Sequence, residues 1–246
     1  MTTPEDRQPT LYSHINGTSS QLLDRFAVSE LCKGWSVYRD GSEWTNYRDL
    51  FTQDAHVWTT WSGGLHIDDF ISVSKKGKAD GDFIMHRECG TLVDLNQETA
   101  RAVGKMKVTI TQRFHQQDTV FDVDCDCRFI FFCMKNDSGE WKARWYKVIY
   151  EKGKYTEVYD RTCNLRWTLT SRSDKVVPVE GKNAPTFPKE ELDKYPEGFM
   201  YLGAAQAALG HPIDTSLPTL TNGGDWRMYG AITEWLEGKQ PDLHKV

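Results

Sequence analysis

Asp40 and His86 are the two residues whose types and surroundings best suit proton transfer. Asp40 follows an amphipathic segment in "YRDGSEW", and His86 enters an apolar stretch in "FIMHRECG". A neutral imidazole alone is a weak base, but a buried carboxylate bonded to one ring nitrogen fixes the tautomer and stabilises the imidazolium that forms. A carboxylate at a helix C-terminus also faces the negative end of the helix dipole, which makes it a better hydrogen-bond acceptor. Such a pair can take a proton from carbon without a metal.

The element that must position Asp40 is a helix. Apolar residues recur at helical spacing from Ser19 onward, and Ser19 or Ser20 could cap the start. A break at "DGS" follows, where Ser42 is placed to cap a second short helix over residues 43–51. The sequence therefore carries the carboxylate to a joint between two helices.

The element that must position His86 is a sheet. After a third helix predicted over residues 67–80, long segments alternate between apolar and polar residues, with turn signals between them. These segments are residues 82–95, 99–116, 119–135 and 140–154, and a shorter strand is predicted over 55–61. Consecutive long strands joined by tight turns predict an antiparallel meander.

Helices first and strands afterwards indicate the α+β class, with the helices packed on one face of a curved sheet. We expect a cone-shaped α+β barrel, in which three N-terminal helices pack on a curved antiparallel sheet and a C-terminal helical extension follows. The end of the first helix and the inner faces of the strands would line the open end of the cone. Asp40 and His86 can therefore meet in the cavity.

Three regions are expected along the chain. Residues 1–18 are polar and predict a flexible arm, and residues 19–158 form the cone domain. In the extension, residues 159–246, a turn-rich stretch precedes a helix near 189–209 that a proline and a glycine interrupt, and a last amphipathic segment follows. This extension cannot build a core alone, so we expect it to wrap the main domain or a neighbouring subunit.

Charge and hydropathy exclude several classes of protein. The formal net charge is −5, and the basic residues are scattered, so the basic surface expected of a nucleic-acid-binding protein is missing. No apolar run is long enough to suggest a membrane protein, and the polar N-terminus predicts a cytoplasmic one. The six cysteines form no CxxC pair and lie mostly in apolar strands, which favours buried, reduced thiols.

The segment "DVDCDC" suggests a metal site but does not fit one. Alternation along a strand puts Asp122, Asp124 and Asp126 on one face and the two cysteines on the other. The three carboxylates then spread over roughly 13 Å, which is too wide for one ion. We interpret them as a solvated outer face and expect neither a metal nor another cofactor.

Three motifs resemble a known family. They are "YRDGSEWTNYRDLFTQDAHV", "IMHRECGTLVDL" and the closing "DSGEWKARWYKVIYEK", in that order. With them, residues 20–158 resemble the SnoaL-like members of the nuclear-transport-factor-2-like superfamily, in the branch that holds scytalone dehydratase and lindane dehydrochlorinase. The resemblance implies that Asp40 orients His86 and that His86 takes a proton from substrate carbon. It also implies a cofactor-independent dehydratase, a lyase, acting on a polyketide-like or other cyclic secondary metabolite.

Donors that stabilise an oxyanion or leaving group are expected around the dyad. The candidates for substrate binding are Tyr38, Trp58, Trp61, Arg113, Arg144 and Tyr146, and the sequence does not fix which strand face looks inward. Glu88 alternates onto the side of His86 and could line the pocket or be exposed. His115 is the candidate for a second catalytic histidine, but its place at a strand end favours the surface.

Other readings of the same residues stay open. Asp40 could serve turn and capping chemistry, paired with Arg39 or Arg48. Within the resemblance, the protein could be an isomerase or cyclase that steers a rearrangement, or a non-catalytic ligand-binding or dimerisation module. The superfamily also implies a homo-oligomer, a dimer or trimer, with one face of the sheet pairing with another subunit. The sequence does not name the substrate.

Overall fold

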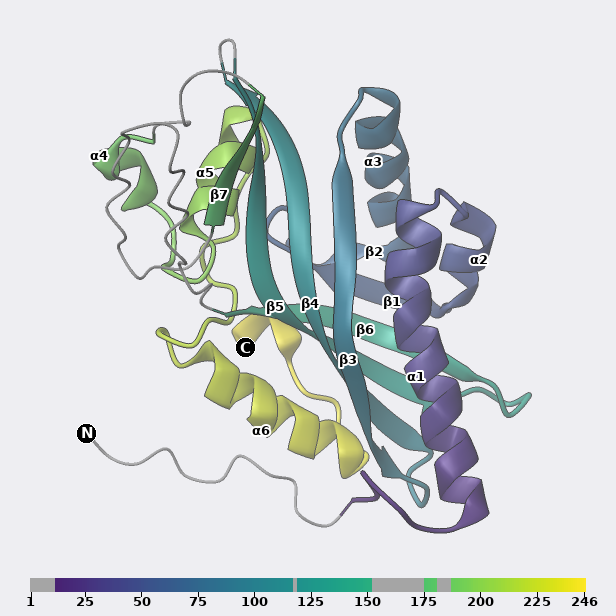
Figure 1. The fold of residues 1–246 in the computed structure, drawn as a ribbon. Coiled ribbons are helices and arrows are strands. Elements are labelled where there is room, and N and C mark those ends of the chain that lie inside the picture. Colours follow the sequence, from purple (N-terminus) through teal and green to yellow (C-terminus); the bar gives the residue numbers. More distant parts are fainter. Residues whose placement is uncertain (1–11, 117–118, 152–174, 181–186) are drawn as a thin grey trace, which may run out of the picture.

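The computed structural model describes residues 12–116, 119–151, 175–180 and 187–246 (Figure 1). Its N-terminal half begins with α1, Ser19–Asp40, followed by α2, Trp44–Asp49. The start of α1 is a capping box: the Thr18 side chain accepts from the main-chain N–H of Gln21, and the Gln21 side chain accepts from that of Thr18. The cap is therefore Thr18 and not Ser19 or Ser20.

The joint after α1 differs from the expected capping arrangement. Ser42 has φ of +61°, in the left-handed region, and the N-cap of α2 is Glu43, which makes no side-chain capping bond. The Ser42 hydroxyl instead accepts from Nζ of Lys78 at 3.1 Å. Lys78 belongs to α3, Ile67–Ala79, so this contact ties the joint to the third helix.

The strands form one sheet in the order β2-β1-β6-β5-β4-β3, with β7 paired to β5. Their bounds are β1 Phe51–Trp58, β2 Leu65–His66, β3 Ile84–Asn96, β4 Arg101–Gln116, β5 Thr119–Lys135, β6 Trp141–Tyr150 and β7 Lys175–Glu180. β3 to β6 form the predicted antiparallel meander, and β1 lies parallel to β6. The α+β class is thus confirmed.

Two strand predictions need correction. β1 begins at Phe51, inside the segment predicted as the second helix. β7 was missed because its sequence, "KVVPVE", contains Pro178 within a stretch rich in turn residues. Proline lacks the N–H that a central strand needs and is tolerated at a sheet edge, and β7 pairs with β5 alone.

Helices cover both faces of the sheet, not one (Figure 1). On the concave face, Trp35 of α1 packs against Phe129 and Tyr146. On the opposite face, Trp235 of α6, Gly224–Leu236, packs against Phe132 and Trp145. Alternation along β5 and β6 separates these two sets, because successive side chains of a strand point to opposite faces. Part of the face expected to meet a second subunit is therefore covered by this chain.

The described part of the C-terminal extension contains three further short elements. They are α4, Lys189–Leu192, α5, Met200–Ala208, and the 3-10 helix η1, Leu243–Lys245. The predicted helix over 189–209 is broken as expected. A Cβ at Gly198 would lie 2.9 Å from the main-chain oxygen of Tyr150, so only glycine allows this close approach. The described part of the extension packs on this chain's own domain, α5 against β5 and α6 against β4 and β6.

The N-terminal arm is only partly described. Ser13 forms an antiparallel bridge with Leu95, so residues 12–18 are tied to the end of β3. The expectation of flexibility for residues 1–11 lies outside the described residues. Among the described helices, none is long and apolar enough to cross a membrane.

Candidate active site

Asp40 and His86 lie in direct contact at the open end of the cone. Asp40 is the last residue of α1, and His86 is the third residue of the edge strand β3. Oδ1 of Asp40 accepts from Nδ1 of His86 at 2.8 Å, and Oδ2 accepts from the main-chain N–H of His86 at 2.6 Å. The second bond is available because an edge strand leaves every other N–H unpaired. Both carboxylate oxygens thus hold one histidine.

This contact fixes the form of the imidazole. A carboxylate only accepts hydrogen bonds, so the proton must lie on Nδ1 and the lone pair on Nε2. Nε2 makes no hydrogen bond to the described residues. The side chain is 4% exposed, and burial lowers the pKa of His86 below its ordinary value of 6.5, an effect that the bond to Asp40 only partly offsets. His86 is therefore a neutral imidazole at neutral pH, and Asp40 fixes its orientation.

Lys78 holds the end of α1 that carries Asp40. Its Nζ donates to the main-chain oxygen of Asp40 as well as to Ser42. A cation at a helix C-terminus binds carbonyls that have no partner within the helix and is favoured by the helix dipole. Burial lowers the pKa of Lys78, and the charge of Arg39 lowers it further, while Asp40 opposes both effects. Lys78 thereby fixes the main chain at Asp40, whereas the carboxylate itself is held by His86.

His86 lines a narrow inner chamber of about 30 Å³. Most of its wall is aromatic or aliphatic and comes from both the cone domain and α5. The lining residues include Trp35, Arg39, Thr60, Trp61, Phe70, Ile84, Ile110, Phe129, Tyr146, Leu202 and Gln206. The aromatic residues of the cone fill most of its interior, because Trp35 alone contacts six other rings. The chamber has room for the reacting part of a molecule only.

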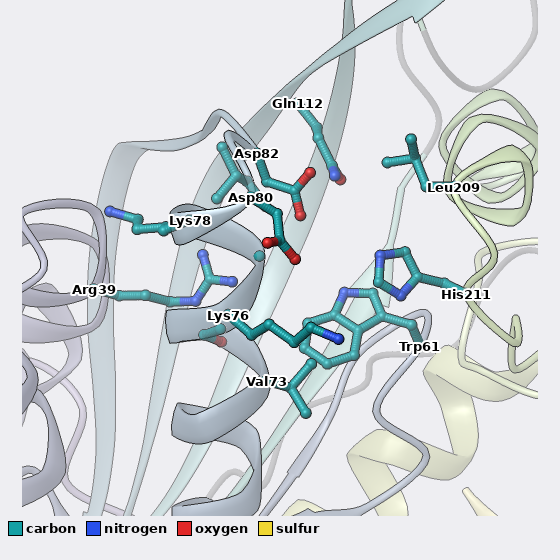
Figure 2. A pocket seen from close by; sticks show the side chains of 13 residues that line it. Arg39, Trp61, Val73, Lys76, Lys78, Asp80, Asp82, Gln112, Leu209 and His211 are labelled. Carbon is teal, nitrogen blue, oxygen red and sulfur yellow. The ribbon is translucent and has the colours of Figure 1, made fainter.

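A larger outer cavity of about 330 Å³, whose lining is shown in Figure 2, shares wall residues with this chamber. Arg39, Trp61 and Ile84 line both spaces. The outer cavity also has charged and polar walls, from Lys76, Lys78, Asp80, Asp82, Gln112 and His211. Its volume falls in the range of small-molecule sites. A ring system can occupy the outer cavity while one functional group enters the chamber.

Stacked rings connect the two cavities. The rings of Trp61 and Phe70 are parallel within 7°, with centroids 5.2 Å apart, and His211 stacks on Trp61 at 5.6 Å. The guanidinium of Arg39 lies 5.6 Å from the centroid of Phe70. This stacking within the protein fixes the ring of Trp61 where the two cavities meet.

The helix α5 closes the site from the side of the C-terminal extension. Gln206 bridges two elements of the cone: its Oε1 accepts from Oγ1 of Thr60 at 2.5 Å, and its Nε2 donates to Oε1 of Gln112 at 2.7 Å. Leu202 lies on the same helix and lines the inner chamber. Within the described residues, the extension thus covers the active-site cavity of its own chain.

Arg39 was not among the predicted site residues, although it lines both cavities. The residue is 6% exposed, and its Nε and Nη1 have no hydrogen-bond partner among the described residues. Nη1 lies 3.9 Å from Oδ1 of Asp40, beyond hydrogen-bond distance. Its position beside the predicted carboxylate was the available signal in the sequence, but an arginine next to an aspartate indicates an ion pair rather than a cavity residue.

Of the six predicted substrate-binding residues, Tyr146 and Trp61 line the inner chamber. Tyr146 stacks on Trp35 with centroids 3.7 Å apart, and its buried hydroxyl has no partner in the described chain. Burial raises the pKa of Tyr146 well above 10, so the hydroxyl keeps its proton as a donor.

The other four candidates lie elsewhere and line neither cavity in the described structure. Trp58 faces Lys147 and His244 on the opposite side of the sheet, and Tyr38 lies on the outer side of α1. Arg113 pairs with Asp122, and Arg144 pairs with Asp54. Their predicted place at the substrate was therefore wrong. Arg113 alternates with Gln112 along β4 and points to the other face of the sheet. Arg144 lies where a bulge shifts the register between β5 and β6.

The remaining polar candidates are accounted for by local contacts. Glu88 is exposed and accepts from Oγ1 of Thr91 at 2.6 Å, and His115 is exposed, as its strand-end position predicted. Asp124 accepts from Arg87, and Asp126 accepts from Thr109, on the face away from the chamber. Within the described residues, no group of three or more His, Cys, Asp or Glu is placed to hold a metal ion.

The sequence shows the family to which the chain belongs. Residues 20–173 match the model of the SnoaL-like domain, so the chain belongs to the SnoaL-like family. Pea pathogenicity protein 2 of Fusarium vanettenii is 37% identical over 98% of this chain and 97% of its own. An uncharacterised protein of Aspergillus terreus is also 37% identical, over 88% of this chain and 78% of its own.

Solved structures resemble the chain more distantly. A presumed scytalone dehydratase from Novosphingobium aromaticivorans is 16% identical, with a TM-score of 0.45 over 68% of this chain and all of its own. The hexachlorocyclohexane dehydrochlorinase LinA-type3 of Novosphingobium barchaimii is 11% identical, with a TM-score of 0.44 over 52% of this chain and 86% of its own. These likenesses are too low to carry an argument about function.

Proposed function

We propose that this protein is a cofactor-independent enzyme of the lyase or isomerase kind, in which His86 removes a proton from a carbon atom of its substrate. The observation that carries the proposal is the double contact between Asp40 and His86. The carboxylate holds both Nδ1 and the main-chain N–H of His86, which leaves Nε2 as the basic atom. A positioned general base of this kind accelerates proton transfer by roughly 10²–10⁴-fold.

The reaction that we favour is dehydration of a hydroxy-ketone or similar carbonyl compound. His86 takes the proton next to the carbonyl, and the electron pair of the broken C–H bond forms an enolate. The enolate then expels hydroxide from the neighbouring carbon, and the imidazolium returns its proton to that hydroxide as it leaves. The products are an unsaturated carbonyl compound and water, and His86 is again neutral.

Isomerisation is the second candidate, and the composition of the chamber supports it equally. Among the described residues that line the inner chamber, His86 is the single histidine and no carboxylate accompanies it. One imidazole must then both take and return the proton. If the proton returns to a different carbon atom, the product is an isomer of the substrate; if it leaves with hydroxide, the product is lighter by one water.

The substrate class follows from the shape of the two cavities. The chamber admits one functional group, and the outer cavity is lined by the rings of Trp61 and His211. This arrangement suits a flat cyclic molecule, such as a polyketide-like secondary metabolite.

A cytoplasmic location and assembly into a homo-oligomer remain predictions from the sequence.

Proton exchange tests the base without requiring the native substrate. A panel of cyclic ketones and hydroxy-ketones is incubated with the protein in D2O, and deuterium at the carbon next to the carbonyl is followed by NMR and mass spectrometry. We expect exchange or loss of water with the wild type, and a decrease of about 10²–10⁴-fold in His86→Asn. Asp40→Asn should also be slow, because the uncharged amide no longer stabilises the imidazolium. His115→Asn, at an exposed histidine, is the matched control, and full turnover by His86→Asn would contradict the proposal.

A further inference from the structure

The inner chamber contains buried hydrogen-bond donors that lack acceptors. Among the described residues, Nε and Nη1 of Arg39, Nε1 of Trp35 and the hydroxyl of Tyr146 are all without a hydrogen-bond partner. All three residues line this chamber. The side-chain oxygen of Gln206 on the same wall already accepts from Thr60. Buried polar groups are almost always paired in folded proteins. We therefore expect these donors to bind an acceptor that the described chain does not supply.

Arg39 adds a charge to this set of donors. Burying a cation without a hydrogen-bonded partner is costly, and its neighbour Asp40 does not supply one. Both oxygens of Asp40 accept from His86, and the nearest lies 3.9 Å from Nη1 of Arg39. The ring of Phe70 contributes only a cation–π contact at 5.6 Å. The missing acceptor should therefore carry negative charge.

Other charged groups at the outer cavity are used differently. Lys78 donates to the main chain of Asp40 and to Ser42, and Lys76 is exposed at the cavity mouth. Asp80 also lies on the outer cavity (Figure 2) but forms no ion pair with Arg39 in the described structure. Arg39 is thus the buried cation that faces the space beside His86.

We propose that Arg39 binds a negatively charged oxygen of the substrate, next to the carbon atom that gives its proton to His86. This inference rests on the proposed function and names its substrates: carbonyl compounds whose oxygen carries the charge. That charge is either the enolate formed when the C–H electron pair moves onto the carbonyl oxygen, or a carboxylate already present. Arg39 would be a catalytic residue in the first case and a specificity-determining residue in the second.

Binding of small anions tests the assignment without turnover. The probes are benzoate, a carboxylate, and 4-nitrophenolate, a planar oxyanion that resembles an enolate, with benzamide and nitrobenzene as the neutral counterparts. Titration calorimetry at mildly alkaline pH keeps both probes ionised and His86 neutral. In the wild type we expect at least one anion to bind about tenfold or more tightly than its neutral counterpart, as charged hydrogen bonds do. Which anion is preferred distinguishes the enolate from the carboxylate.

Variants test whether Arg39, and not another residue of the site, causes the preference for anions. Arg39→Met should bring the ratio of anion to neutral binding close to one, and Arg39→Lys should retain part of it. Lys107→Met is the matched control, because Lys107 is an exposed cation of β4 that lines neither cavity, and this variant should leave the ratio unchanged. The melting temperature of Arg39→Met should not fall below that of the wild type, since a buried charge whose Nε and Nη1 make no hydrogen bond to the described residues is removed, so folding does not obscure the result.

The outcomes distinguish this inference from the proposed base. His86→Asn should keep the anion preference while losing proton exchange. Equal binding of anions and neutral probes by the wild type, or an unchanged preference in Arg39→Met, would overturn the assignment of Arg39 and leave the role of His86 standing. Full proton exchange by His86→Asn together with loss of anion preference in Arg39→Met would overturn the role of His86 and leave the assignment of Arg39 standing.

Discussion

Each face of the sheet buries a tryptophan and a cation, but the hydrogen bonds of these side chains differ between the two faces. On the face opposite the chamber, the indole N–H of Trp235 lies 3.2 Å from the main-chain oxygens of both Ala102 and Cys133. Nζ of the buried Lys147 donates to the main-chain oxygens of Leu243 and Val246 at 2.6 and 2.7 Å. On that face, main-chain oxygens satisfy the donors of Trp235 and Lys147, whereas Nε1 of the neighbouring Trp58 has no hydrogen-bond partner among the described residues.

On the concave face, the buried tryptophan and the buried cation are Trp35 and Arg39. The indole N–H of Trp35 and two of the guanidinium nitrogens of Arg39 have no partner in the described chain. The difference shows that burial alone does not identify a site. Buried donors whose partners are supplied by the chain hold the fold together, whereas buried donors left open toward a cavity indicate a ligand.

Truncating Trp235 should give the largest loss of stability. Trp235→Ala removes a fully buried ring that packs on Phe132 and Trp145, so the free energy of unfolding should fall by about 3–5 kcal/mol. Trp226→Ala, on the same helix but 40% exposed, is the control and should cost much less. Urea denaturation measures both. Equal losses in the two variants would show that the opposite face is not the packed interior described above.

Neutralising the two buried cations should have unequal effects. Lys147→Met removes the donor from two main-chain oxygens, those of Leu243 and Val246, and should lower the free energy of unfolding by about 1–3 kcal/mol. Arg39→Met removes a charge that the chain does not satisfy and should cost nothing or stabilise the fold. The two variants are compared by urea denaturation under one condition. A larger loss of stability in Arg39→Met than in Lys147→Met would contradict the claim that the chain satisfies Lys147 and leaves Arg39 for a ligand.

Acid should weaken the fold through His86, by a smaller amount. The pKa of His86 is below its ordinary value of 6.5 in the folded protein, so the unfolded chain binds its proton first as the pH falls. Stability from this residue is complete above pH 6.5 and is lost below it, until the folded pKa is reached. The wild type should therefore lose stability faster than His86→Gln as the pH falls below 6.5. Parallel curves for the two proteins, measured by urea denaturation at a series of pH values, would contradict the lowered pKa.

The fold could be predicted from the sequence where periodicity was long and uninterrupted. The alternation over Thr119–Lys135 gave β5 at its observed bounds, and the helical spacing from Ser19 gave α1. The pattern was insufficient where proline, bulges or distant contacts decide the structure. β7 contains Pro178, Arg144 lies at a register shift, and Gln206 reaches the chamber from a helix 120 positions after His86.

The candidate site was predictable in the part that local chemistry fixes. Asp40 at a helix end and His86 on an apolar strand belong to types and positions that the sequence displays, and the structure joins them at 2.8 Å. Arg39 could not be found in this way, because arginine next to aspartate suggests an ion pair. In the structure the carboxylate of Asp40 bonds to His86 instead, and the guanidinium of Arg39 lines the cavity.

The protonation of His86 tests the central claim most directly and needs no substrate. Nitrogen-15 NMR of protein labelled at the histidine rings reports which ring nitrogen carries the proton, with Asp40→Asn assigning the signals. At neutral pH the account predicts a neutral ring with the proton on Nδ1, held by Asp40, and an unprotonated Nε2. A ring protonated on Nε2, or an imidazolium at neutral pH, would contradict the claim that His86 is a base poised at the chamber.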